Sequence, residues 1–292
     1  MTVEQLIGNT PLVEINNINP NPKVKIYCKL EGQNPGGSVK DRAAYNMISE
    51  ALKRGDIKKG DKLVEATSGN TGIALAMISR LLGLEMHLLM PDSATVERVK
   101  SMEAYGANVI LTPAAKTIEY TRQLAQEMAD SGEYFMLNQF ANPDNSGAHY
   151  KNTGPEIWKD TEGKITHFVS AMGTTGTIMG VSRFLKEQNP NIQIVGTQPT
   201  DGSKIPGIRR WSKEMVPKIF DASRVDSVID VSQEEATKMT RRMAEEEALL
   251  VGMSSGGALA AAIRLAETLE EGILVCIVCD RGDRYLSSNL FA

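Results

Sequence analysis

The sequence predicts an α/β protein built around mostly parallel, twisted sheets. Short apolar runs typical of buried strands alternate with longer amphipathic runs typical of helices, which is the pattern of right-handed βαβ units. The chain has 292 residues, of which 41% are hydrophobic, so it is long enough for one large domain or for two lobes that share a cleft. We find no internal repeat and no flexible linker, which favours interwoven lobes over separate domains that follow one another along the chain.

The first half of the chain opens with a strand at 25–30, a glycine-rich loop and a helix at 42–54. The apolar side chains of this helix fall on one face, and Gly55 marks its end. Apolar runs then predict strands and amphipathic runs predict helices, in the order strand 62–66, helix 73–82, strand 86–90, helix 94–105, strand 108–111 and helix 116–131.

The second half repeats the alternation. A helix is expected to begin near His149, and the pair Gly154-Pro155 complicates its path because proline lacks the N–H that a helix needs. A long polar loop is expected at 202–211. The remaining elements are expected in the order strand 166–170, helix through 186, strand 192–197, charged helix 234–247, alanine-rich helix from 254 through 268 and strand 273–278.

Composition excludes several classes of protein. A net charge of −4 and a pI near 5.6 argue against nucleic-acid binding, and no apolar run reaches the roughly 18 residues of a membrane span. Three cysteines do not form a disulfide framework, and the N-terminus lacks the features of a secretory signal. We therefore expect a cytoplasmic protein that binds neither membranes nor nucleic acid.

Three strand-to-helix turns are rich in glycine and hydroxyl residues: 67–72, 173–177 and 254–257. In a parallel sheet such turns lie at the carboxyl ends of the strands, where helix N-termini offer unpaired N–H groups to anions. Neither of the glycine motifs that bind dinucleotides or nucleoside triphosphates occurs. The turns therefore predict an anionic ligand without naming it, and a lysine at a helix start, such as Lys40, does not identify it either.

A family resemblance indicates which ligand to expect. The motifs PGGSVKDR (35–42), TSGNTG (67–72) and GTTGT (173–177) resemble those of the cysteine synthase family of pyridoxal 5′-phosphate (PLP) enzymes. IGNTPL (7–12), QFANP (139–143), TGPEI (153–157), SSGG (254–257) and RYLS (284–287) match the family in the same order, so the resemblance covers essentially the whole chain. IPGIRRW (205–211) and CDRGDRY (279–285) are similar to the B branch of that family, the O-acetylserine sulfhydrylases B.

The resemblance implies fold type II of PLP enzymes, which is similar to the tryptophan synthase β subunit and usually forms a homodimer. In this fold each of two lobes has a mostly parallel twisted sheet flanked by helices. Residues 1–35 and 141–292 would form a larger lobe, with the sites for the cofactor phosphate and ring nitrogen. Residues 36–140 would form a smaller, mobile lobe that carries the loop for the substrate carboxylate.

The resemblance also implies roles for individual residues. Lys40 would be the catalytic residue, which forms the Schiff base and acts as general acid and base. The cofactor would further be bound by Asn70 at its 3′ oxygen, Ser254 at its ring nitrogen, and Gly173, Thr174, Thr175, Gly176 and Thr177 at its phosphate. Substrate would be bound by Thr67, Ser68, Thr71, Gln139, Arg209 and Cys279, and no metal is expected.

The implied reaction is a β-replacement. Acetate would leave O-acetyl-L-serine, an aminoacrylate would form, and sulfide would add to give L-cysteine. A serine at the ring nitrogen is a neutral partner, which suits this elimination better than chemistry that needs a long-lived carbanion. Arg209 is favoured over Arg210 as the residue that would admit thiosulfate, giving S-sulfocysteine.

Several alternatives stay open at this point. A serine or threonine dehydratase and a cystathionine β-synthase share the fold and cofactor, and a catalytically silent homologue that binds amino acids or partners is a different class. O-phosphoserine is an alternative donor, and docking of a serine acetyltransferase is undecided. The pair Cys276 and Cys279 is not expected to form a redox dithiol or a zinc site, because it lies in or at the end of a strand. The histidines are scattered, and none of them is assigned a function.

Overall fold

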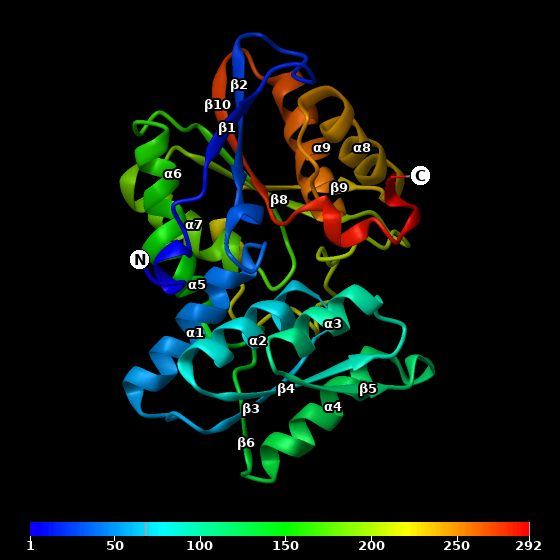
Figure 1. The fold of residues 1–292 in the computed structure, drawn as a ribbon. Helices are drawn as coiled ribbons and strands as arrows, with labels where there is room; N and C mark the ends of the chain where they lie inside the picture. Colours follow the sequence, from blue (N-terminus) through cyan, green and yellow to red (C-terminus); the bar gives the residue numbers. More distant parts are fainter. Residues whose placement is uncertain (68, 292) are drawn as a thin grey trace.

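The computed structural model describes residues 1–67 and 69–291, without the side chains of Thr117 and Glu119. It contains two sheets, each covered by helices, and the smaller lies below the larger in Figure 1. The prediction of an α/β protein with two mostly parallel sheets is confirmed. Within the described residues, no helix has the length and apolar character needed to cross a membrane.

The larger sheet has six strands in the order β1-β2-β10-β7-β8-β9, and only the β1–β2 pair is antiparallel. The strands are β1 (Leu12–Ile15), β2 (Val24–Leu30), β7 (His167–Ala171), β8 (Gln193–Pro199), β9 (Ser227–Val231) and β10 (Gly272–Val278). The helices around it are α5 (Pro143–Ala148), α6 (Gly154–Asp160), α7 (Gly176–Gln188), α8 (Gln233–Glu247) and α9 (Met253–Thr268).

Strand β10 shows how this sheet is buried on both faces. Leu274 and Cys276 pack into the core beneath α8 and α9, whereas Val275 and Ile277 pack into the core beneath α6 and α7. Successive side chains of a strand point to opposite faces, so a continuous apolar run fits a strand that is covered on both sides.

The smaller sheet has four parallel strands in the order β5-β4-β3-β6. They are β3 (Lys62–Ala66), β4 (Glu85–Pro91), β5 (Asn108–Thr112) and β6 (Tyr134–Met136). Figure 1 shows α1 (Lys40–Arg54), α2 (Asn70–Leu82) and α3 (Val96–Ala104) on one face and α4 (Thr117–Asp130) on the other. Two separate apolar clusters fill these two faces.

One predicted helix start is wrong. The helix expected near His149 begins at Pro143 instead, where the side chain of Asn142 accepts a hydrogen bond from the N–H of Asp144 at 2.9 Å. A π-helical turn at His149–Thr153 then leads into α6. Pro155 lies in the first turn of α6, where its missing N–H removes little hydrogen bonding.

Candidate active site

A cavity lies between the two sheets, where the first turns of α1, α2 and α9 and the loop before α7 meet. Ten of the predicted site residues line it: Lys40, Thr67, Asn70, Thr71, Gln139, Gly173, Thr174, Arg209, Ser254 and Cys279. Thr175, Gly176 and Thr177 continue from Thr174 into the start of α7. The predicted residue Ser68 lies outside the described residues.

The cavity also has lining residues for which the sequence predicted no role. They include Ile118 and Arg122 of α4, Phe140, and Gly207 of the polar loop. The guanidinium carbon of Arg122 lies 4.6 Å from the centre of the Phe140 ring. Arg122 lies in a helix rich in polar residues, so no local pattern distinguishes it from a solvated side chain.

The loop before Lys40 is fixed to the end of β10. The N–H of Val39 donates to the carbonyl of Cys279 at 2.8 Å, and Ser38 forms a β-bridge with Asp280. Asp41 accepts a hydrogen bond from the N–H of Gly36 at 2.5 Å. Burial raises the pKa of Asp41 to about 7 against the opposing effect of this hydrogen bond. Lys40 therefore begins α1 from a loop held at both ends.

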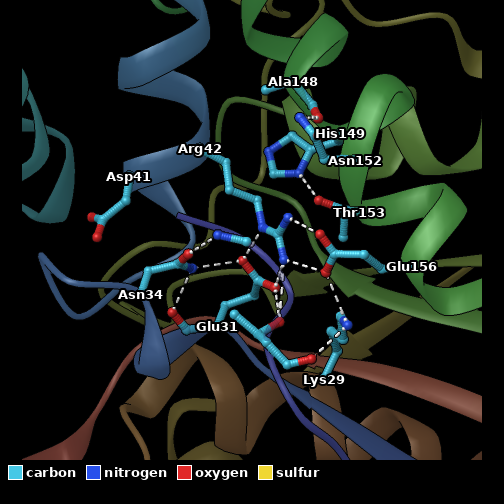
Figure 2. Close-up of polar contacts among 12 residues, drawn as sticks. Lys29, Glu31, Asn34, Asp41, Arg42, Ala148, His149, Asn152, Thr153 and Glu156 are labelled. Atoms are coloured by element: carbon cyan, nitrogen blue, oxygen red, sulfur yellow. Dashed lines mark hydrogen bonds and ion pairs between the residues drawn. The ribbon is translucent and has the colours of Figure 1, made fainter. Parts of the chain in front are cut away.

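Directly after Lys40, the side chain of Arg42 fastens α1 to the elements of the larger sheet (Figure 2). Its guanidinium donates to both oxygens of Glu31 at 2.6 and 2.8 Å and to both oxygens of Glu156 at 2.6 and 2.7 Å. Lys29 adds a second cation, with its Nζ 3.0 Å from Glu156. We call Lys29, Glu31, Arg42 and Glu156 the Arg42 cluster.

Three members of the Arg42 cluster are buried, and the side chain of the fourth, Glu156, is 14% exposed. Lys29 and Glu31 have no exposed surface and Arg42 is 2% exposed. Burial opposes ionisation of Glu156, but the hydrogen bonds and charge of Arg42, together with Lys29, outweigh it and lower its pKa to about 2. The cluster therefore holds paired charges and fixes the first turn of α1, where Lys40 lies.

The loop Gly173–Thr177 presents backbone N–H groups at the start of α7. Thr175 adopts a left-handed conformation with φ +68°, which turns the chain into the helix. Among the described residues, no acceptor pairs with the N–H groups of Gly173, Thr174 and Thr175. Such a loop before a helix is suited to an anion, because its donors and the helix dipole point the same way.

Two glycines of this loop have no room for a side chain. A Cβ at Gly173 would lie 2.5 Å from the carbonyl oxygen of Gly207, and one at Gly176 would lie 2.1 Å from Oδ1 of Asn145. Asn145 in turn donates to the hydroxyl of Thr174 at 3.1 Å. The glycines therefore let the loop pack closely while its N–H groups stay open.

His149, to which the sequence gave no function, contacts this loop. Its Nε2 lies 3.3 Å from the hydroxyl of Thr177 and its Nδ1 lies 2.9 Å from the hydroxyl of Thr153. Burial and the charges of Arg42 and Lys40 lower the pKa of His149 well below its ordinary value, so the ring is neutral at pH 7. Figure 2 shows His149 next to Arg42.

Thr71 and Gln139 form a polar wall of the cavity. The hydroxyl of Thr71 donates to Oε1 of Gln139 at 2.9 Å, which leaves the amide N–H groups of Gln139 available as donors. The buried carboxyl of Glu65 accepts from the N–H of Asn138 at 3.0 Å, and burial raises its pKa to about 7. This wall suits a carboxylate.

Of the two neighbouring arginines, Arg209 lines the cavity. Its backbone N–H donates to the carbonyl of Met172 at 2.9 Å, which ties the polar loop to the end of β7. Arg210 instead donates to the carbonyl of Pro199 at 2.8 Å and pairs with the carboxylate of Asp230. The two side chains therefore have different surroundings.

The cysteines are free thiols. Cys276 is buried in β10, and Cys279 follows that strand and lines the cavity. Burial raises the pKa of Cys279 to about 11, so its thiol is protonated at neutral pH. Among the described residues no group of histidine, cysteine, aspartate or glutamate could hold a metal ion.

The residues of this cavity fit PLP. A lysine, a hydroxyl at the start of α9 and a loop of open N–H groups line one space, which matches an aldehyde, a ring nitrogen and a phosphate. The chain belongs to the family of pyridoxal-phosphate-dependent enzymes, whose model matches residues 3–280.

The relatives and solved structures agree with this family. The chain is 57% identical to the cysteine synthase B of Pseudomonas aeruginosa, over 99% of this chain and 97% of the relative. It is 57% identical to the cysteine synthase B of Escherichia coli, with coverages of 99% and 96%. The solved cysteine synthase of Entamoeba histolytica superposes with a TM-score of 0.94 at 37% identity, covering 99% of this chain and 90% of that one. The predicted resemblance to the cysteine synthases is therefore confirmed.

Proposed function

We propose that this chain forms L-cysteine from O-acetyl-L-serine and sulfide with PLP bound in the described cavity. The observation that carries the proposal is that Lys40 lines one cavity together with Gly173 and Thr174, whose N–H groups have no acceptor among the described residues. Relatives called cysteine synthase B, at 57–58% identity over nearly the whole chain, support the choice of reaction.

The cofactor would be held at its four polar ends by residues of this chain. The loop Gly173–Thr177 would bind the phosphate through its N–H groups, and Asn70 would donate to the 3′ oxygen. The hydroxyl of Ser254 would face the ring nitrogen, and Lys40 would bond covalently to the aldehyde carbon. When bound, PLP supplies an electron sink that stabilises negative charge developing at the substrate Cα.

The polar wall around α2 would orient the substrate. The hydroxyl of Thr67 and the amide of Gln139 would donate to its carboxylate, together with Ser68, and Thr71 would orient the Gln139 amide through its hydrogen bond to Oε1. The substrate amine would displace Lys40 from the aldehyde carbon, and the freed Lys40 amine, which lines the same cavity, would then remove the Cα proton as general base. Acetate would leave from the β carbon, sulfide would add there, and Lys40 as general acid would return a proton to Cα to give cysteine.

Arg209 would extend the reaction to a larger anion. Arg209 lines the cavity, and its guanidinium would bind thiosulfate, whose use would give S-sulfocysteine. Cys279 would contact the substrate as a neutral, protonated thiol.

Three further features belong to this proposal. The residues 1–35 and 141–292 would form one lobe and 36–140 a smaller lobe that moves on substrate binding. The chain would act in the cytoplasm as a homodimer. Sedimentation at micromolar concentration tests the dimer, and a monomer at all concentrations would reject it.

Product identification by mass spectrometry tests the function. PLP-loaded protein is incubated with O-acetylserine plus either sulfide or thiosulfate. We expect cysteine with sulfide and S-sulfocysteine with thiosulfate. Cysteine alone would reject the role of thiosulfate, and pyruvate without either product would point to a dehydratase.

A further inference from the structure

The side chain of Asn70 is held by two charged groups from the end of the chain. Its Nδ2 donates to Oδ2 of Asp280 at 2.7 Å, and its Oδ1 accepts from Nη1 of Arg284 at 2.5 Å. Asn70 begins α2, beside the smaller sheet, whereas Asp280 and Arg284 follow β10 of the larger sheet. These contacts therefore join segments that are more than two hundred residues apart in sequence.

The two partners determine which way the amide of Asn70 points. A guanidinium can only donate hydrogen bonds, and an ionised carboxylate can only accept them. The oxygen of the amide must therefore face Arg284 and the nitrogen must face Asp280, since the reversed amide would lose both contacts. One hydrogen on Nδ2 is used by Asp280, and the second remains as a donor that Asn70 can offer to the cavity it lines.

Asp280 is itself rigidly placed. It has no exposed surface, and its Oδ2 also accepts from the hydroxyl of Tyr285 at 2.7 Å. Its Oδ1 is buried without a hydrogen-bond partner among the described residues. A Cβ at Gly252 would lie 2.0 Å from that oxygen, so the carboxylate fills a space that only a glycine leaves open.

Arg284 connects Asn70 to the loop that precedes Lys40. Its Nη2 donates to the carbonyl oxygen of Gly36. A Cβ at Gly37, whose φ is +81°, would lie 2.4 Å from the same nitrogen, so glycine makes room for the guanidinium. Neither Asp280 nor Arg284 lines the cavity, and any effect they have on a ligand must pass through residues that do.

We propose that Asp280 and Arg284 are positioning residues that lock the amide of Asn70 with an N–H directed to the ligand. This inference rests on the proposed function, in which the atom opposite Asn70 is the 3′ oxygen of PLP. That oxygen is a hydrogen-bond acceptor when ionised, so a locked donor selects it, and a rotated amide would present an oxygen instead. The end of the chain thereby takes part in cofactor recognition without touching the cofactor.

A double-mutant cycle tests whether Asp280 acts on PLP binding through Asn70. PLP is titrated into the apoprotein of the wild type, Asp280→Ala, Asn70→Ala and the double variant, and the affinity and the wavelength of the visible band are recorded. We expect each single variant to bind PLP about tenfold more weakly and to shift the band in the same direction. The double variant should bind no more weakly than Asn70→Ala.

Further variants show whether PLP affinity depends on the orientation of the Asn70 amide, on the charge of Asp280 or on folding. Asp280→Asn keeps an acceptor for Asn70 without the charge, so its PLP affinity should stay near that of the wild type. Arg284→Met should weaken PLP binding, whereas Arg281→Met should not, because Arg281 is exposed and pairs with Asp283. If Asp280→Ala does not fold, Arg284→Met in the same cycle with Asn70→Ala takes its place.

The outcomes distinguish this inference from the proposed function. Wild-type protein that takes up no PLP would overturn both. In a second outcome, the wild type binds PLP while Asp280→Ala weakens PLP binding equally in the presence and absence of Asn70. That result would overturn only the positioning role of Asp280 and Arg284. An equal loss of affinity in Asp280→Asn and Asp280→Ala would also overturn it, because the charge and not the orientation would then be responsible.

Discussion

Replacing Arg42 by methionine is expected to cost a large part of the stability of this protein. The substitution keeps an unbranched apolar stem and removes the four hydrogen bonds that the guanidinium donates to Glu31 and Glu156. Glu31 has no exposed surface, and it would keep only the hydroxyl of Thr10 at 2.7 Å and the amide of Asn34 at 3.0 Å. A buried carboxylate would thus lose its countercharge.

The expected magnitude follows from this loss. Breaking a buried ion pair by removing one partner costs about 3–5 kcal/mol, because the other charge stays buried and unpaired. Folded domains are stable by only about 5–15 kcal/mol, so the variant should unfold at much lower urea concentration. The matched control is Arg54→Met on the same helix, whose exposed ion pairs should contribute less than about 1 kcal/mol.

The pH dependence gives a second test of the same cluster. The pKa of Glu156 is lowered from 4.5 to about 2, so the folded protein releases this proton more readily than the unfolded chain. The corresponding stability, about 3 kcal/mol, is present above pH 4.5 and is lost as the pH falls through 2. Arg42→Met should lose less stability than the wild type between pH 5 and pH 2. If the free energy of unfolding of Arg42→Met at neutral pH differs from that of the wild type by less than about 1 kcal/mol, the buried ion pairs do not contribute as argued.

Three other predictions concern single positions. Burial raises the pKa of Asp41 to about 7, so the folded protein binds this proton more tightly and should lose stability as the pH rises from about 4 to 7. Asp41→Asn should lack that loss in urea titrations at pH 5 and pH 8, and parallel behaviour of the two proteins would contradict it. Gly176→Ala should lower the melting temperature and weaken PLP binding, because its Cβ would lie 2.1 Å from Oδ1 of Asn145, and an unchanged melting curve would be inconsistent with that clash. Arg209→Ala should reduce kcat/KM for thiosulfate more than for sulfide, and an equal loss with both would reject its role.

Much of the fold could be predicted because its signals are local. The alternation of apolar runs places most strands of both sheets, and Gly55 does end α1 as its left-handed cap. Strands β1, β6 and β9 were not predicted, because each lies at the edge of its sheet and is only partly buried. A partly exposed strand carries a weaker apolar pattern than a central one.

The residues of the candidate site that lie in glycine-rich loops or family motifs could be predicted. Asn70 and Gly173 follow the carboxyl ends of β3 and β7, and Lys40 follows the glycine-rich loop after β2, so the topology brings all three into one cavity. The pairing of Arg42 with Glu156 and of Asn70 with Asp280 could not be predicted, because each joins residues more than one hundred positions apart. Such contacts depend on how the two sheets are packed, and no local pattern encodes them.

The most direct test of the central claim is to find where PLP becomes attached. PLP-loaded protein is reduced with borohydride, digested and analysed by mass spectrometry. We predict that the reduced cofactor is found on the peptide that contains Lys40 and is absent from that peptide in Lys40→Ala. Cofactor fixed to a different lysine of the wild type, or to none, would contradict the assignment of this cavity.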